Sequence, residues 1–124
     1  MIRAAFAVLG SLIAAVAGIP PADEDPGERV FRQCDSCHSV SDDNAGMTGP
    51  NLAGVVGRAA GSVPDFPYSD ALTGAGKQGL VWTPEALGVY LAVPHDGSIG
   101  FHGLSDPADR AAVIAYLRKL GAGP

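Results

Sequence analysis

The stretch that decides the fold of this chain is Cys34-Asp35-Ser36-Cys37-His38. Two cysteines separated by two residues, and followed at once by a histidine, form the attachment signature of c-type haem. The thiols add to the two porphyrin vinyl groups, and the histidine then binds the iron as the proximal ligand. Because Cys34 and Cys37 are the only cysteines in the sequence, no structural disulfide competes for them. We therefore expect one covalently attached haem c per chain.

The cysteine pair has other possible uses, and the surrounding sequence fits them less well. A bare Cys-x-x-Cys also occurs in thioredoxin-like redox sites and as half of a zinc site. A zinc site needs two further cysteine or histidine ligands at short spacing, whereas His95 and His102 lie far downstream. A thioredoxin-like site belongs to an alternation of strands and helices that this sequence lacks. Haem attachment is the favoured interpretation, and a redox dithiol is the alternative.

The N-terminal segment has the features of a secretory signal peptide. Arg3 supplies a positive charge, residues 4–17 are almost entirely apolar, and small residues end the run. We expect a signal peptide over residues 1–17 and one domain over residues 18–124, with its core at 25–120. The apolar run is shorter than the roughly 20 residues of a transmembrane helix. A cleaved leader, no stable membrane insertion and a periplasmic or otherwise exported protein are therefore expected. An uncleaved membrane tether is the alternative.

Charge narrows the range of partners. The chain has 8 basic and 13 acidic residues and a net charge of −5, and loss of Arg3 with the leader makes the domain more acidic. No basic cluster is present, so nucleic acid is not an expected partner. A domain of this size has a marginal hydrophobic core, which a covalently attached haem would enlarge. We expect a monomer that meets its protein partners briefly.

Three helices are predicted from a shared start signal, a capping side chain followed by proline. The signal occurs at Asp25-Pro26, Thr83-Pro84 and Asp106-Pro107. The first helix is expected to run through Phe31 into the cysteine motif. The second should stop before Pro94, and the third should end at Gly121. With a shorter helix at residues 69–73, the predicted fold class is all-α, with long loops that pack on the cofactor.

By these features the chain resembles the class I cytochromes c, in particular the bacterial and mitochondrial-type soluble proteins, over about residues 25–120. Gly27-x-x-x-Phe31 is similar to the family's first helix, and Val113-Ile114-Ala115-Tyr116-Leu117 is similar to its last helix. The resemblance implies a small cytochrome c fold around the haem. It also implies that the glycine allows the last helix to cross the first at short distance.

Further matches concern the surroundings of the haem, at Gly49-Pro50-Asn51-Leu52, Gly57-Arg58, Phe66-Pro67-Tyr68 and Val81-Trp82. The resemblance implies that the Pro50 carbonyl accepts a hydrogen bond from the second ring nitrogen of His38, which would fix the ring. It also implies that Arg58, Tyr68 and Trp82 lie near the inner haem propionate. Such a placement is physically reasonable, because a buried carboxylate needs hydrogen-bond donors or a counter-charge. For the two aromatic residues, an ordinary place in the core is the alternative interpretation.

The sequence departs from the family on the distal side of the haem. Family members bind the iron there through a methionine two residues before a Phe-x-Gly-Leu segment. Here that segment is Phe101-His102-Gly103-Leu104, and the methionine position is Ile99. The stretch from Pro94 to Ile99 is also shorter than in mitochondrial-type members. Met47 lies before Gly49-Pro50, so the resemblance puts it on the proximal side.

Three distal arrangements remain open: no strong protein ligand beneath Ile99, ligation by His95, or ligation by His102. Side chains alternate between the two faces of an extended segment. If Phe101 faces the haem, its neighbour His102 therefore points away. An open site would admit neutral diatomic molecules such as CO or NO and would permit weak peroxidase-like activity. A second histidine ligand would lower the reduction potential relative to methionine.

The function implied by the resemblance is electron transport by a periplasmic haem c protein that is not an enzyme. The alternative is a haem protein that binds or senses CO or NO through an open distal site. Mitochondrial-type carriers surround the haem edge with lysines, whereas Lys77 is the only basic residue between Arg58 and Arg110. We therefore expect weak electrostatic steering toward acidic partners. The redox partners themselves are not identified by the sequence.

Overall fold

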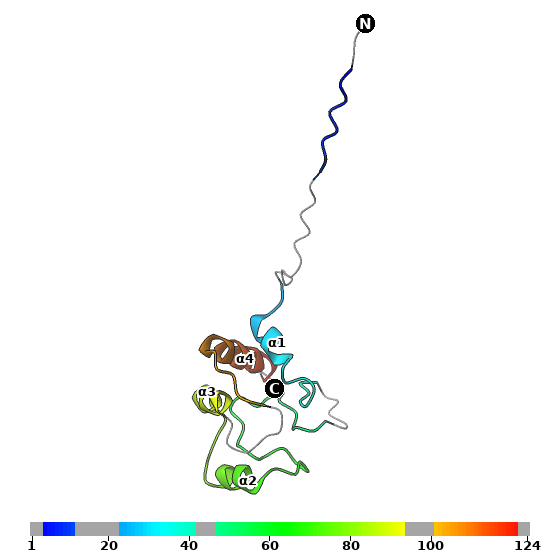
Figure 1. The fold of residues 1–124 in the computed structure, drawn as a ribbon. Helices are drawn as coiled ribbons and strands as arrows, with labels where there is room; N and C mark the ends of the chain where they lie inside the picture. The colour runs from blue at the N-terminus through cyan, green and yellow to red at the C-terminus, as the bar shows by residue number, and fades with distance from the viewer. Residues whose placement is uncertain (1–3, 12–22, 42–46, 94–100, 122–124) are drawn as a thin grey trace.

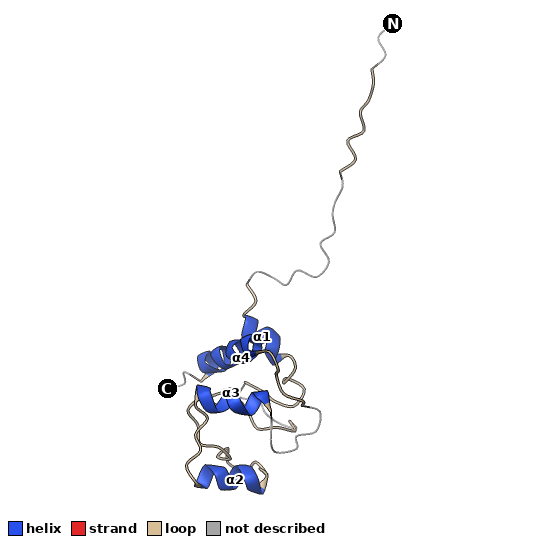
Figure 2. Ribbon diagram, turned by 60° about the vertical axis from the view of Figure 1, so that its left-hand side comes forward, coloured by secondary structure: helices blue, strands red, loops and turns tan. Residues whose placement is uncertain are grey.

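The computed structural model describes residues 4–11, 23–41, 47–93 and 101–121. Along the chain it contains α1 (Pro26–Phe31), α2 (Asp70–Lys77), α3 (Pro84–Ala92) and α4 (Pro107–Leu120). Helix α1 packs against α4, α3 lies along α4, and α2 lies apart from the other three (Figure 1). The described residues contain no strand (Figure 2), and none of their helices is long and apolar enough to cross a membrane. The predicted all-α class is confirmed.

The predicted starts of the three main helices are confirmed by their capping hydrogen bonds. The backbone N–H of Gly27 donates to Asp25 at 2.8 Å, that of Ala86 to Thr83 at 3.0 Å, and that of Ala108 to Asp106 at 2.8 Å. Each bond satisfies one of the donors left without a partner in the first helical turn. Helix α1 ends at Phe31, and hydrogen-bonded turns continue the chain through the cysteine motif.

Helix α2 is longer than predicted. Its cap is Ser69, whose hydroxyl accepts from the N–H of Leu72 at 3.2 Å, but it continues to Lys77 rather than ending at Thr73. Glycines at positions 74 and 76 lower the helix propensity of this stretch, which hid the extension. A Cβ at Gly76 would overlap the carbonyl oxygen of Ala60. The glycine is therefore required by a contact with a distant segment, which local propensity does not reveal.

The crossing of α1 and α4 depends on Gly27. A Cβ at this position would overlap the carbonyl oxygen of Ala112 and the Cβ of Tyr116. The close approach expected of this glycine is therefore present. Two contacts flank the crossing: the rings of Phe31 and Tyr116 lie 5.7 Å apart, and Lys119 forms an ion pair of 2.5 Å with Asp25.

A short antiparallel pairing closes the loop that contains α2. The N–H of Gly57 donates to Trp82 O at 2.8 Å, and the N–H of Trp82 donates to Arg58 O at 2.8 Å. The N–H of Ala60 donates to Leu80 O at 2.9 Å, and residues 59 and 81 form an isolated β-bridge. The pairing holds the ends of the 57–82 segment together.

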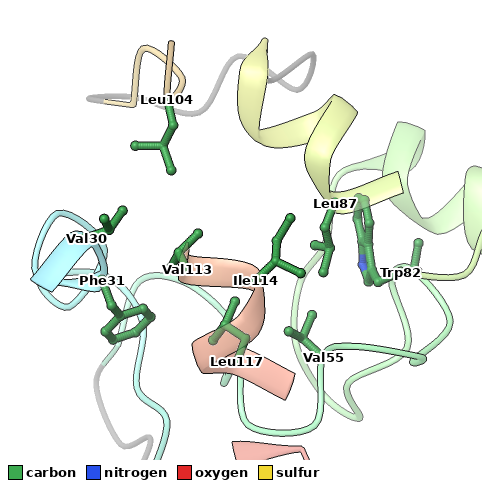
Figure 3. Packing of buried hydrophobic residues seen from close by; sticks show 10 residues of the cluster. Val30, Phe31, Val55, Trp82, Leu87, Leu104, Val113, Ile114 and Leu117 are labelled. Carbon is green, nitrogen blue, oxygen red and sulfur yellow. The ribbon is translucent and has the colours of Figure 1, made fainter. Parts of the chain in front are cut away.

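The hydrophobic core lies where α1, α3 and α4 meet the loops (Figure 3). Val113 on α4 is 2 % exposed and occupies its centre. The other buried members are Val30, Phe31, Val55, Ala60, Trp82, Leu87, Leu104, Ile114 and Leu117. Several partly buried residues pack against this cluster, among them Cys34 and Phe101. One side of the cysteine motif and one side of the 101–104 segment therefore rest on the same core.

The apolar side chains of the N-terminal segment are exposed. Phe6, Val8 and Leu9 have exposed fractions of 90–93 %. Residues 4–11 are in no helix, and the expected cleavage point after residue 17 lies outside the described residues. The signal peptide over residues 1–17 therefore stays a prediction.

Candidate haem-binding site

The cysteine motif forms two successive turns directly after α1. The N–H of Cys34 donates to Phe31 O at 2.7 Å, and the N–H groups of Cys37 and His38 donate to Cys34 O at 3.1 and 2.9 Å. These bonds place both thiols and the imidazole on one compact turn. Both cysteines are partly buried and neither forms a disulfide. The turn thus presents two free thiols next to a histidine, which is the donor set that haem c requires.

The imidazole of His38 is held by the loop that follows it. Its Nδ1 donates to the carbonyl oxygen of Pro50 at 2.8 Å; the ring nitrogen is the donor because a carbonyl can only accept. The hydrogen bond that the resemblance implied is therefore present. In a neutral imidazole whose proton is on Nδ1, the lone pair of Nε2 can bind a metal ion.

Gly49 fixes the ring from a second direction. It is buried, its N–H donates to Cys37 O at 2.7 Å, and a Cβ on it would lie 2.6 Å from Nδ1 of His38. The absence of a side chain allows the backbone to lie against the imidazole. Sequence reasoning noted this glycine but missed its contact with the ring. The only local signal was a glycine directly before Pro50.

The surroundings of the Cys34 thiol shift its pKa upward. Burial raises this pKa, and the nearby Asp35 and Cys37 raise it further. Thiols that attack as thiolates in redox dithiols have lowered pKa values, so the shift at Cys34 is opposite in direction to that of an activated redox thiol.

Arg58 is a half-buried cation without a described counter-charge. Its Nη1 donates to the carbonyls of Asn51 at 3.0 Å and Ala53 at 3.4 Å. Burial lowers the pKa of the guanidinium, and the effect of Tyr68 opposes this shift. The ion pairs among the described residues involve other side chains, and none includes Arg58. A half-buried cation of this kind can bind an anionic group such as a haem propionate.

Tyr68 lies between Arg58 and α2, and Trp82 follows α2. The hydroxyl of Tyr68 accepts from the N–H of Val63 at 3.0 Å, which leaves its own proton free for donation. Trp82 is 8 % exposed and its ring centre lies 5.0 Å from that of Tyr90. Trp82 is therefore a member of the core, and its backbone pairing with Arg58 brings the two residues together.

The described part of the distal segment contains one of the candidate ligands, His102. Phe101 is partly buried against the core, whereas the adjacent His102 is exposed. This is the alternation expected for an extended segment. Ile99 and His95 lie outside the described residues.

Met47 lies on the other side of the motif. Together with His38, Phe31 and Val40 it lines a shallow depression of about 260 Å³. Met47, the only methionine of the sequence besides Met1, therefore lies beside His38, the proposed proximal ligand.

Comparisons with known proteins agree on the family. The cytochrome c family model matches residues 24–121. A cytochrome c2 of Rhodopseudomonas palustris is 52 % identical over 115 residues, covering 79 % of this chain and 98 % of that protein. A cytochrome c2 of Afifella marina is 45 % identical over 98 residues, covering 76 % of this chain and 79 % of that protein. The solved structure of cytochrome c2 from Rhodospirillum centenum has a TM-score of 0.67 at 36 % identity, covering 78 % of this chain and 98 % of that one.

Proposed function

The chain belongs to the cytochrome c family, and on that basis we propose that it carries single electrons between periplasmic redox proteins. It is an electron carrier with one covalently bound haem c, and it is not an enzyme. The exported location and the brief docking of a monomer to its partners are parts of the proposal. The exported location is supported by the apolar leader-like segment and by covalent haem attachment.

Cys34 and Cys37 are proposed to form the two thioether bonds, and His38 to bind the iron. The haem supplies an iron that changes reversibly between two oxidation states. The chain holds the His38 ring in one orientation through Pro50 and Gly49. The hydrogen bond from Nδ1 raises the basicity of Nε2 and so strengthens it as a ligand. A rigid ligand lowers the rearrangement that accompanies each electron transfer.

Arg58 and Tyr68 are proposed to bind the inner propionate. The guanidinium directs donors toward backbone carbonyls and has no described carboxylate as partner, and the Tyr68 hydroxyl keeps a free proton. Both groups stabilise a buried carboxylate. Trp82 positions the loop from within the core and is proposed to contact the haem through its edge.

The observation that carries the proposal is the fixed imidazole of His38 directly after two free thiols. On the distal side, the exposed position of His102 disfavours ligation by this residue. Its replacement by alanine should leave the haem spectrum unchanged. The relatives are cytochromes c2 and give no support to CO or NO sensing.

Membranes from the source organism provide the test of the proposed function. Reduced haem-loaded protein should be oxidised by these membranes through repeated turnovers, with oxygen or another respiratory acceptor as the final oxidant. Boiled membranes provide the control. Failure of the intact membranes both to oxidise the reduced protein and to reduce the oxidised protein would contradict the proposal.

A further inference from the structure

The 101–105 segment is anchored first to α3. The N–H of Leu104 donates to Leu91 O at 2.7 Å. Gly103 has a φ of 87°, and a Cβ on it would overlap the carbonyl oxygen of Ala92. Leu104 is 4 % exposed, so the anchor lies at the edge of the core. These contacts fix one side of the segment to the last turn of α3.

Arg110 on α4 supplies a second anchor. Its Nη1 donates to the carbonyls of Leu104 at 2.6 Å and Ser105 at 3.2 Å. Arg110 is partly buried and forms no ion pair with any described residue, so within this part of the chain its donors serve the backbone alone. Hydrogen bonds from a charged donor are stronger than neutral ones. The backbone of the segment is therefore held between two helices.

We propose that Arg110 is a positioning residue for electron transfer, because it fixes the segment that carries Phe101. The inference rests on the proposed function and on the family resemblance, by which Phe101 would face the haem from the distal side. Without the two bonds to Leu104 and Ser105, the segment moves away from α4 and water reaches the haem more easily. A more polar environment favours the oxidised iron, which carries the greater positive charge. Loss of Arg110 therefore lowers the reduction potential and speeds ligand entry.

The test compares two arginines of the same helix in the haem-loaded protein. Arg110→Met removes the anchor and retains much of the apolar side chain. Arg118→Met is the matched control, because it removes the same charge from α4 at an exposed position that donates no side-chain hydrogen bond to a described residue. The measured quantities are the CO association rate of the reduced protein and the reduction potential. Loss of a charged hydrogen bond corresponds to a change of about tenfold or more in an opening equilibrium.

We expect Arg110→Met to bind CO about tenfold faster or more than the original protein and to have a lower reduction potential. Arg118→Met should have nearly the CO association rate and the reduction potential of the original protein. Arg110→Lys keeps the charge but lacks the forked donors, so its CO association rate should lie between those of the original protein and Arg110→Met. If Arg110→Met does not accumulate, Arg110→Lys replaces it, and a CO rate equal to the original overturns the proposal.

A lower melting temperature of Arg110→Met with an unchanged CO rate and potential would show a purely structural role and would also overturn the proposal. The proposed function is tested separately by electron exchange of the unsubstituted protein with membranes. The proposed function can therefore stand even if Arg110 has no positioning role. If the unsubstituted protein exchanges no electrons with membranes, the proposed function and the inference about Arg110 both fail.

Discussion

His38 is held by two neighbours that contribute no side-chain donor or acceptor. One is the carbonyl oxygen of Pro50, and the other is the bare Cα of Gly49. A backbone carbonyl cannot be removed by an ordinary substitution, so the position of the ring depends most directly on the space at Gly49. The residue that is proposed to bind the iron and the glycine against which its ring lies are thus close neighbours in space.

Gly49→Ala tests this space. The added Cβ would lie 2.6 Å from Nδ1 of His38, so the ring or the backbone must move. We expect a loss of about 1–3 kcal/mol in unfolding free energy and an altered haem absorption spectrum. Pro50→Ala is the control, because it retains the carbonyl acceptor and should leave the spectrum unchanged. Equal spectra for Gly49→Ala and the original protein would show that the glycine does not orient the ligand.

At the scale of the elements, the packing of α1 on α4 is set by one missing side chain. Gly27→Ala places a methyl group against the backbone of Ala112 and should destabilise the fold by about 1–3 kcal/mol. Gly88→Ala on α3 is the matched control, because among the described residues no atom outside the backbone of its own helix lies within 4 Å of the new methyl group. It should stabilise the fold by about 0.5–1 kcal/mol through helix propensity. Thermal or denaturant unfolding of the holoproteins measures both, and similar effects of the two changes would refute the crossing argument.

Asp25 joins the same two helices and predicts a dependence of stability on pH. A hydrogen bond from Lys119 lowers the pKa of its carboxyl group, and the N–H of Gly27 lowers it further. A carboxyl group with a lowered pKa in the folded state stabilises the protein above the unfolded pKa of about 3.9 and loses this effect as pH falls through the folded pKa. The stabilisation by Asp25 should therefore disappear in the acid range below about pH 4.

Asp25→Asn isolates the charge, because asparagine keeps the capping oxygen for α1. We expect the original protein to melt at a higher temperature than the variant near pH 7, with the difference closing in acid. Melting temperatures measured between neutral and strongly acid pH check this expectation. A difference that stays constant across the range would mean that the ion pair with Lys119 contributes nothing to stability.

The elements that were predictable from sequence have local causes. Asp25, Thr83 and Asp106 cap their helices through contacts within three residues, so short motifs located them. The full length of α2 and the bridge between residues 59 and 81 depend on distant contacts, and sequence patterns did not indicate them. In the candidate haem site, too, local motifs were predictable from sequence and distant contacts were not. The cysteine motif identified the cofactor, whereas the contact between Gly49 and the ring and the anchoring by Arg110 required the folded chain.

At the scale of the whole molecule, charge decides how partners are approached. The chain has a net charge of −5, and Lys77 is the only basic residue between Arg58 and Arg110. Long-range attraction to an acidic docking face is therefore weak, and exposed charges are screened within about 8 Å at physiological ionic strength. Apolar and hydrogen-bonding contacts should then dominate the docking of this protein.

The rate of electron exchange with membranes should consequently depend little on salt. When the ionic strength is raised from low to physiological values, we expect the exchange rate to fall by less than the roughly tenfold that is typical of partners attracted by opposite charges. A lysine-ringed mitochondrial-type cytochrome c, assayed with membranes of its own source, provides the comparison. A steep fall in rate with added salt, together with an acidic docking face on the partner, would contradict this expectation.

A cytochrome c that carries electrons takes up and releases one electron reversibly through its haem, and a potentiometric titration of the haem-loaded protein measures this property directly. The haem absorption is recorded in the reductive and the oxidative direction under an inert gas. We expect one curve in both directions with a slope of one electron. Separate reductive and oxidative curves, or haem that does not return to its oxidised form without loss, would contradict it.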